Sequence, residues 1–477
     1  MAALRAANTR LRQVIEAKDA EVVVLRAQVE ALRAEMEALR ARLAQNPRNS
    51  SKPPSSEGLA KPAPRSLRGK SGRRPGRPKG QPGTTLQMTD RPDAVITHEP
   101  GACAGCGKSL PGAPVASTER HQVIDLPEDI RAVVTEHRII SRRCPCGTVT
   151  AGAAPHGVMA PVQYGPRITA VCAYLWHGQF LSRSRTCEAV SELFGIPVSE
   201  GAVAGMIKRI AGKLGGTLDA IGRALTAAPV AHFDETGFRV AGKLAWVHSA
   251  SSGKFTLITV HPKRGRAGMD AAGVLPLFTG IAVHDCWSPY DTYAGLAGHA
   301  LCNAHALREL QAVTDAAPGG VWCWAGQAAD ALRDMKRLAD ASLATDGTLD
   351  HVDPGKLAEL RHRYHSALMI GKNHTAARPG PLMRKHHALA TRLLDRQDDY
   401  LRWTSDPAVP FDNNAAEREI RMGKLRIKVS GCMRSLAGAE AFCAIRSYLS
   451  TAAKHGIGKL AALTQAATGT PWIPATT

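Results

Sequence analysis

Apolar positions near the start of the chain recur with a period of seven residues. Two interleaved registers carry them: Leu4, Leu11, Leu25, Leu32 and Leu39 in one, and Ile15, Val22, Val29, Met36 and Leu43 in the other. This spacing is typical of a coiled coil, and Asn8 and Lys18 are the polar exceptions in its seam. We therefore predict a coiled coil over residues 1–45 that makes the protein a homo-oligomer. An amphipathic helix folded onto its own domain is the alternative.

Short apolar runs in the middle of the chain end in carboxylates. Residues 230–234 read as a buried strand ending in Asp234, and residues 281–284 as another strand followed by Asp285. Successive strand side chains point to opposite faces, so Asp234 and its neighbour Glu235 cannot both face one site. We expect Asp234 to face it. If the two strands are neighbours, the aspartates come together, and such a pair usually shares a proton or a cation.

Two further runs between these strands have the same character. Residues 243–249 and 255–260 predict strands, because a turn containing glycine precedes each. The sequence therefore indicates a sheet around the two aspartates.

A helix with two distinct faces follows Pro410. Its inward stripe recurs at helical spacing: Ala416, Ile420, Gly423 and Ile427. A second row lies about 100° round the helix: Glu417, Arg421, Lys424 and Lys428. The basic residues suit a DNA backbone. Asp234, Asp285 and Glu417 together offer hard oxygen ligands that suit two Mg²⁺ or Mn²⁺ ions held against a DNA phosphate.

Other helical patterns lie on either side of these residues. Residues 302–310 predict a helix that turns Asn303, Ala306 and Leu310 to one face, leaving His305 and Arg308 able to reach the scissile phosphate. Residues 322–343 and 354–370 resemble amphipathic helices. Residues 186–194, a turn, and a helix capped by Ser199 predict either a helix-turn-helix or two ordinary packed helices.

The charge of the chain indicates its partner. The formal net charge is +20, which favours nucleic acid or an anionic membrane. No apolar run reaches the roughly 18 residues of a membrane span. Residues 47–89 carry ten Lys or Arg against one Glu, so we expect a disordered basic linker. Within it Arg73, Arg74, Arg77 and Lys79 resemble the core of an AT-hook, with a plain spacer as the alternative.

The cysteines fall into two classes. Most are scattered singly, which fits reduced thiols in a cytoplasm. Two close pairs, Cys103 with Cys106 and Cys144 with Cys146, predict one structural Zn²⁺ held by four sulfurs. Only one residue separates the second pair, so His121, His137 or His156 could replace a sulfur, and absence of metal is the other alternative. Between the pairs, residues 120–141 alternate as strands do.

Four blocks of sequence resemble a known family. "HFDETGFRV", "VHDCWSPY", "CNAHALREL" and "PFDNNAAEREIR", in this order, are similar to the motifs of the insertion sequence 66 family of bacterial transposases. The resemblance runs from about residue 1 to residue 460. It implies an RNase H-like core of the DDE class, with Asp234, Asp285 and Glu417 as the catalytic triad and a helical insertion between the last two. It also implies a zinc module and accessory proteins encoded by the same element.

We therefore expect a multidomain α/β transposase, cytoplasmic and associated with the nucleoid. It would bind the terminal inverted repeats of its element and join them to target DNA. The domains expected are a coiled coil (1–45), basic linker (46–90), zinc module (91–160), helical region (161–225), catalytic core (226–428, insertion about 315–408) and helical tail (429–477). The alternatives are a catalytically inactive DNA-binding protein and an RNase H-like nuclease without strand transfer.

Overall fold

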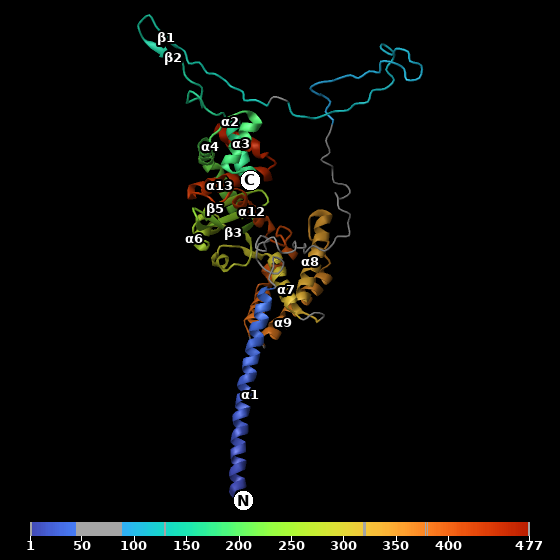
Figure 1. Ribbon diagram of the computed structural model, residues 1–477, viewed down its shortest axis with the longest axis vertical. Helices are drawn as coiled ribbons and strands as arrows, with labels where there is room; N and C mark the ends of the chain where they lie inside the picture. The colour runs from blue at the N-terminus through green and yellow to red at the C-terminus, as the bar shows by residue number, and fades with distance from the viewer. Residues whose placement is uncertain are drawn as a thin grey trace. The chain divides into compact units, whose positions relative to one another are not determined.

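Figure 1 shows the computed structural model of the chain. The structure describes residues 2–43, 88–127, 130–317, 321–376, 378 and 380–475. The chain forms two compact units, one made of residues 1–65, 136–192 and 196–477, the other of residues 66–135 and 193–195. The AT-hook-like residues Arg73, Arg74, Arg77 and Lys79 lie outside the described residues, as does nearly all of the predicted linker.

A five-stranded mixed sheet forms the centre of the larger unit. Its strands are β3 (Val230–Val240), β4 (Lys243–Ser251), β5 (Thr256–His261), β6 (Ile281–His284) and β7 (Gly298–Leu301). They lie in the order β5-β4-β3-β6-β7. The first three are antiparallel to one another, whereas β6 and β7 run parallel to β3. The four strands predicted from apolar runs are confirmed, and the sheet contains one strand, β7, that was not predicted.

Alternation along β3 sends its side chains into two separate cores. Phe233 packs with residues of α5 (Gly215–Thr226) and α6 (Arg266–Ala271) on one face. Phe238 packs on the other face with α12 (Asn414–Ser430) and α13 (Leu436–Lys454). Because the side-chain period of a strand is two, odd and even residues of β3 serve different cores. The helix predicted after Pro410 is therefore confirmed as α12, and it covers the even-numbered face.

A helical region covers the β6–β7 side of the sheet. It comprises α7 (Asn303–Ala316), α8 (Trp324–Asp346), α9 (Pro354–Ala376), α10 (Pro381–Asp395) and α11 (Gln397–Leu401). Their apolar faces share one core with Val283 of β6 and with Ala300 and Leu301 of β7. The helices predicted over residues 302–310, 322–343 and 354–370 are confirmed. The chain leaves the sheet after β7 and returns to it at α12, as an insertion would.

Helices before the sheet pack with the end of the chain. They are α2 (Pro166–Ala173), a π-helix (Tyr174–Gly178), α3 (Arg183–Phe194) and α4 (Glu200–Lys213). The predicted cap is confirmed, because the Ser199 hydroxyl accepts a hydrogen bond of 3.1 Å from Ala202 N. Ile207 and Ile210 of α4 are buried against α2, α13 and α14 (Lys459–Thr468). The second helix of the possible helix-turn-helix thus uses its apolar face for core packing.

A single helix, α1 (Ala2–Leu43), accounts for the heptad region. The seam side chains that the structure describes are exposed, for example Leu11 at 61%, Val29 at 46% and Leu32 at 64%. Such a stripe needs a partner to bury it. The helix is confirmed, and its self-association stays a prediction. Among the described residues, no helix is both long and apolar enough to span a membrane.

The strand-like pattern over residues 120–141 was wrong. A short hairpin, β1 (Ser141–Arg143) with β2 (Val149–Ala151), begins only at its end, and the described residues from 120 to 140 form no strand. Val123, Val133 and Val134 are 88–92% exposed. Alternating side chains stabilise a strand only when one face is buried, and here neither face is.

Candidate active site

The sheet places two of the predicted acids at the same level. In the parallel pairing of β3 with β6, Val230 lies opposite Ile281 and His232 opposite Val283. Two residues further along each strand come Asp234 and Asp285, so the two carboxylates follow the same edge of the pair. Each oxygen Oδ1 accepts a local backbone hydrogen bond, from Glu235 N for Asp234 (2.9 Å) and from Trp287 N for Asp285 (3.1 Å).

Glu417 reaches this edge from the first turn of α12. Asn413 is the N-cap residue of α12 but makes no side-chain capping hydrogen bond, whereas Asp412 Oδ1 accepts from Asn414 N at 3.0 Å. The side chain of Asn413, which is 1% exposed, binds β3 instead. Its Nδ2 donates to the Phe233 carbonyl at 2.8 Å, and its Oδ1 lies 2.8 Å from His232 Nδ1. Asn413 therefore fixes the start of α12 beside Asp234.

The three acids influence one another electrostatically. Burial raises the pKa of Asp234 well above its ordinary value, and the negative charges of Glu235, Asp285 and Glu417 raise it further. A buried carboxyl in such a field is neutral or binds a cation. Carboxylate oxygens are the ligands that Mg²⁺ and Mn²⁺ prefer, so these residues fit a hard divalent ion.

Glu235 belongs to the opposite face of β3. Arg264 donates to its Oε1 through Nε at 3.0 Å and Nη2 at 2.7 Å, and the Tyr290 hydroxyl donates to its Oε2 at 2.8 Å. The Arg264 guanidinium also lies 3.9 Å from the centre of the Trp287 ring. Burial raises the pKa of Glu235 despite these partners. Glu235 is therefore held in an ion pair, and Asp234 is the acid left on the α12 side.

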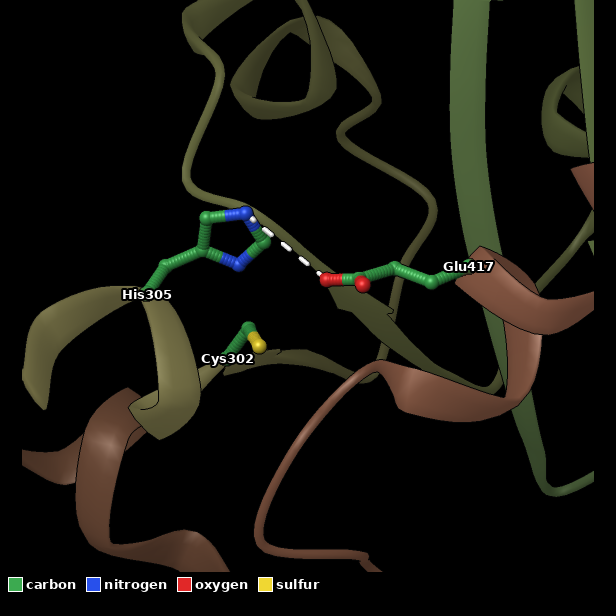
Figure 2. Close-up of side chains that lie close together, drawn as sticks. All are labelled: Cys302, His305 and Glu417. Carbon is green, nitrogen blue, oxygen red and sulfur yellow. Dashed lines mark ion pairs between the residues drawn. The ribbon is translucent and has the colours of Figure 1, made fainter. Parts of the chain in front are cut away.

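The helix start at α7 brings further side chains to Glu417. The distance from Glu417 Oε1 to Arg308 Nη2 is 3.4 Å, and to His305 Nε2 it is 3.8 Å. Burial lowers the pKa of His305 to about 4, and the charge of Arg308 contributes. His305 is therefore neutral at physiological pH. Figure 2 shows that Cys302 lies beside His305 and Glu417.

The side chains of Cys302, His305 and Glu417 lie close enough together to bind one metal ion. Cys302, His305 and Glu417 are the only set of three His, Cys, Asp or Glu side chains, among the residues described, whose ligand atoms all lie within 4.8 Å of one another. Asp234, Asp285 and Glu417 do not form such a set in the structure. Sequence reasoning assigned no role to Cys302, although the three-residue spacing from Cys302 to His305 is what places both on one side of a helix start.

The basic row of α12 points outward. Arg421 pairs with Glu417 Oε2 at 3.3 Å and is exposed, as are Lys424 and Lys428. Inward residues of the same helix, Ala416, Ile420 and Gly423, are buried as predicted. The helix therefore presents cations to solvent next to the acidic edge of the sheet.

Each predicted zinc pair forms a tight turn of its own. Gly107 N donates to the Cys103 carbonyl at 2.9 Å, and Gly147 N donates to the Cys144 carbonyl at 2.9 Å. Both glycines have positive φ, 72° and 91°, which such turns require. Hydrogen bonds from Thr148 lower the pKa of Cys146 to about 7. Cys103 and Cys106 lie in one unit and Cys144 and Cys146 in the other, and a shared zinc ion stays a prediction.

Comparison with known families identifies the class of the protein. Its fold and its acidic edge lie within a region, residues 161–441, that matches a family of transposases. That family is the one described as "Transposase IS66 family", and because the match covers more than half of the chain, the protein belongs to it. Residues 2–87 match a second family model, which is described as a family of unknown function (DUF6444). A comparison with curated proteins gives no match.

Proposed function

We propose that this protein is a DDE-type DNA transposase that binds the ends of an insertion element, cleaves the strand there and joins it to target DNA. The observation that carries the proposal is that β3 and β6 hold Asp234 and Asp285 at the same level, and that Asp285 and Glu417 add to burial in raising the pKa of Asp234. A mixed sheet with an insertion between its last strand and α12 supports an RNase H-like core.

The acids would hold two Mg²⁺ or Mn²⁺ ions. Bound ions of this kind activate the attacking oxygen and neutralise the leaving oxygen in phosphoryl transfer. The protein itself supplies position and charge. Asn413 sets the place of Glu417, and Arg308 lies 3.4 Å from the Glu417 carboxylate, where its positive charge would act on a bound phosphate. His305 is neutral there, so it contributes a hydrogen-bonding group rather than a charge.

DNA would bind along exposed cations. Arg421, Lys424 and Lys428 form a row that starts one turn from Glu417, so a strand lying on that row places a phosphate at the acids. The basic segment with Arg73, Arg74, Arg77 and Lys79 would add affinity for DNA. We further propose that Cys103, Cys106, Cys144 and Cys146 hold a structural Zn²⁺ and that α1 makes the homo-oligomer that joins two ends. The domain boundaries expected from the sequence belong to this proposal, as do accessory proteins of the element.

The decisive experiment mixes purified protein with labelled DNA carrying the inverted repeat that flanks its gene, a second DNA, and Mg²⁺ or Mn²⁺. We expect metal-dependent joining, lost in Asp285→Ala and in Glu417→Gln. Glu440→Gln is the matched control, because Glu440 is an exposed acid on α13 outside the acidic edge. Cleavage without joining would identify a nuclease. Binding without cleavage, even with the neighbouring gene products added, would identify a DNA-binding protein that has lost catalysis.

A further inference from the structure

Two helix starts meet at Glu417, and each brings a different ligand chemistry. Cys302 precedes α7 and His305 lies in its first turn, whereas Glu417 lies in the first turn of α12. A thiol, an imidazole and a carboxylate thus converge on one space, as Figure 2 shows. In the proposed Mg²⁺ chemistry only the carboxylate is a metal ligand, and the imidazole contributes a hydrogen-bonding group. The thiol has no role in it.

The atoms of this group are arranged as ligands. The three donor atoms lie within 4.8 Å of one another, and His305 Nε2 is 3.8 Å from Glu417 Oε1. The backbone N–H of Asn413 donates to Cys302 Sγ at 3.2 Å, a bond that stabilises a metal-bound thiolate. His305 Nδ1 is buried and has no hydrogen-bond partner among the residues that the structure describes. The imidazole therefore keeps an unused nitrogen in the same pocket of polar atoms.

We propose that Cys302, His305 and Glu417 bind one thiophilic divalent cation of the Zn²⁺ class, and that this cation silences the transposase by withdrawing Glu417 from the hard-metal site. The binding itself follows from the cluster, whereas the silencing rests on the proposed function. Zinc prefers sulfur and nitrogen ligands and takes four of them, so three protein ligands leave one position for water. Mg²⁺ disfavours sulfur, so the two ions select different partners around the same carboxylate.

The surrounding charges are compatible with a cation. Arg308 and Arg421 contact Glu417, while the carboxylates of Asp285 and Asp412 act on His305 from the other elements. Burial raises the pKa of Cys302, so its thiol would lose its proton only when the metal binds; the resulting thiolate and Glu417 would then supply two negative charges to balance a divalent ion. Cys302 is 1% exposed, so the ion must enter past His305 and Glu417, whose side chains are 22% and 18% exposed.

Cobalt binding tests the site without reference to catalysis. Metal-free full-length protein is titrated with Co²⁺, and bound metal is counted after equilibrium dialysis while sulfur-to-cobalt absorption is recorded. We expect Cys302→Ser and His305→Gln each to bind one equivalent less than the wild type, because both lack a ligand. Cys443→Ser is the matched control, since Cys443 is equally buried but packs in the apolar core under α13. The four cysteines of the predicted zinc site are present in every variant, so any cobalt that they bind is the same in each and does not affect the comparison.

Asp234→Asn separates this site from the proposed catalytic one. It should keep the additional cobalt equivalent although it lacks an acid of the triad, whereas Glu417→Gln should lose it. Equal cobalt binding by wild type, Cys302→Ser and His305→Gln would overturn the proposal. So would loss of the equivalent in Asp234→Asn, because cobalt would then occupy the hard-metal site. Near-ultraviolet circular dichroism establishes that each variant is folded before it is counted.

Zinc inhibition tests the regulatory half. At fixed Mg²⁺, Zn²⁺ should inhibit wild-type cleavage, and the inhibiting concentration should rise at least about tenfold in Cys302→Ser, measured against the variant's own uninhibited rate. Identical inhibition of the two would refute silencing through this site. If no cleavage is seen with either protein, even with the neighbouring gene products added, the proposed function has failed, while the cobalt count still decides whether the site exists.

Discussion

Asn413→Ala tests how the acidic edge is assembled. The substitution removes two hydrogen bonds of 2.8 Å, one to the Phe233 carbonyl and one to His232 Nδ1. Each such bond contributes about 1 kcal/mol, and a buried group left without a partner costs roughly 1–3 kcal/mol. Since both partners lie on β3 beneath α12, we expect a loss of about 2–4 kcal/mol. That is a large part of the roughly 5–15 kcal/mol that stabilises a typical domain.

The effect on cleavage should be larger than the effect on folding suggests. Glu417 lies one turn beyond Asn413, so freeing the helix start displaces the carboxylate from Asp234. A displacement of about 1 Å at a reacting centre can cost on the order of 100-fold in rate. We therefore expect Asn413→Ala to reduce metal-dependent cleavage by about that factor while DNA binding is retained.

Asn414→Ala is the matched control, because Asn414 is the same residue type, one position further, and exposed. Thermal unfolding followed by calorimetry should show a midpoint at least about 4 °C lower for Asn413→Ala than for the wild type. This takes a loss of about 2 kcal/mol in the free energy of unfolding and a shift of about 2 °C for each kcal/mol. Asn414→Ala should change stability by less than about 0.5 kcal/mol. Equal unfolding midpoints for the two variants would refute the anchoring role of Asn413. So would amide hydrogen exchange in α12 that is no faster in Asn413→Ala than in the wild type.

Three further outcomes follow from the same structure. Asp234→Asn should raise the unfolding midpoint in metal-free buffer, and by more as pH rises. The reason is that the raised pKa of the folded Asp234 carboxyl lowers the stability of the wild type from about pH 4 upward. Unfolding midpoints of wild type and variant that change in parallel with pH would contradict this. Adding MgCl₂ should raise the midpoint of the wild type and not of Asp234→Asn, because an ion stabilises only the state that binds it, and equal shifts would place the ion elsewhere. A peptide of residues 1–45 should self-associate in analytical ultracentrifugation, and a monomer at high micromolar concentration would argue against the coiled coil.

The sequence predicted the acid-bearing elements because each has a strong local pattern. An apolar run that ends in an aspartate marks β3 and β6, and a proline followed by helical spacing marks α12. Strand β7 was missed because its four residues, Gly298–Leu301, include a glycine and a histidine and therefore lack the continuous apolar run that marks β6. The opposite error occurred over residues 120–141, where alternation exists without a buried face. A local sequence pattern indicates the propensity of a segment to form a strand, but the strand forms only when a neighbouring strand pairs with it and one face is buried.

Contacts between elements could not be predicted from any local pattern. Nothing in the sequence indicates that the start of α7 faces the start of α12, and this pairing alone brings Cys302 and His305 to Glu417. Asn303 was visible as a residue on one face of a helix, and Asn413 as part of a family motif. Their roles, however, depend on carbonyl groups far along the chain. The site residues were therefore predictable as a set of candidates, and their geometry was not.

These long-range contacts explain how a large helical insertion can lie between two of the proposed catalytic acids without disturbing them. The insertion leaves the sheet at Asn303, whose side chain donates to the Phe411 carbonyl at 3.1 Å. It returns at Asn413, whose amide donates to Cys302 Sγ at 3.2 Å and whose side chain binds β3. Both ends of the insertion are thus bound to each other and to the sheet. Because its ends are fixed, the length and packing of α8 to α10 can change while Glu417 keeps its place opposite Asp234.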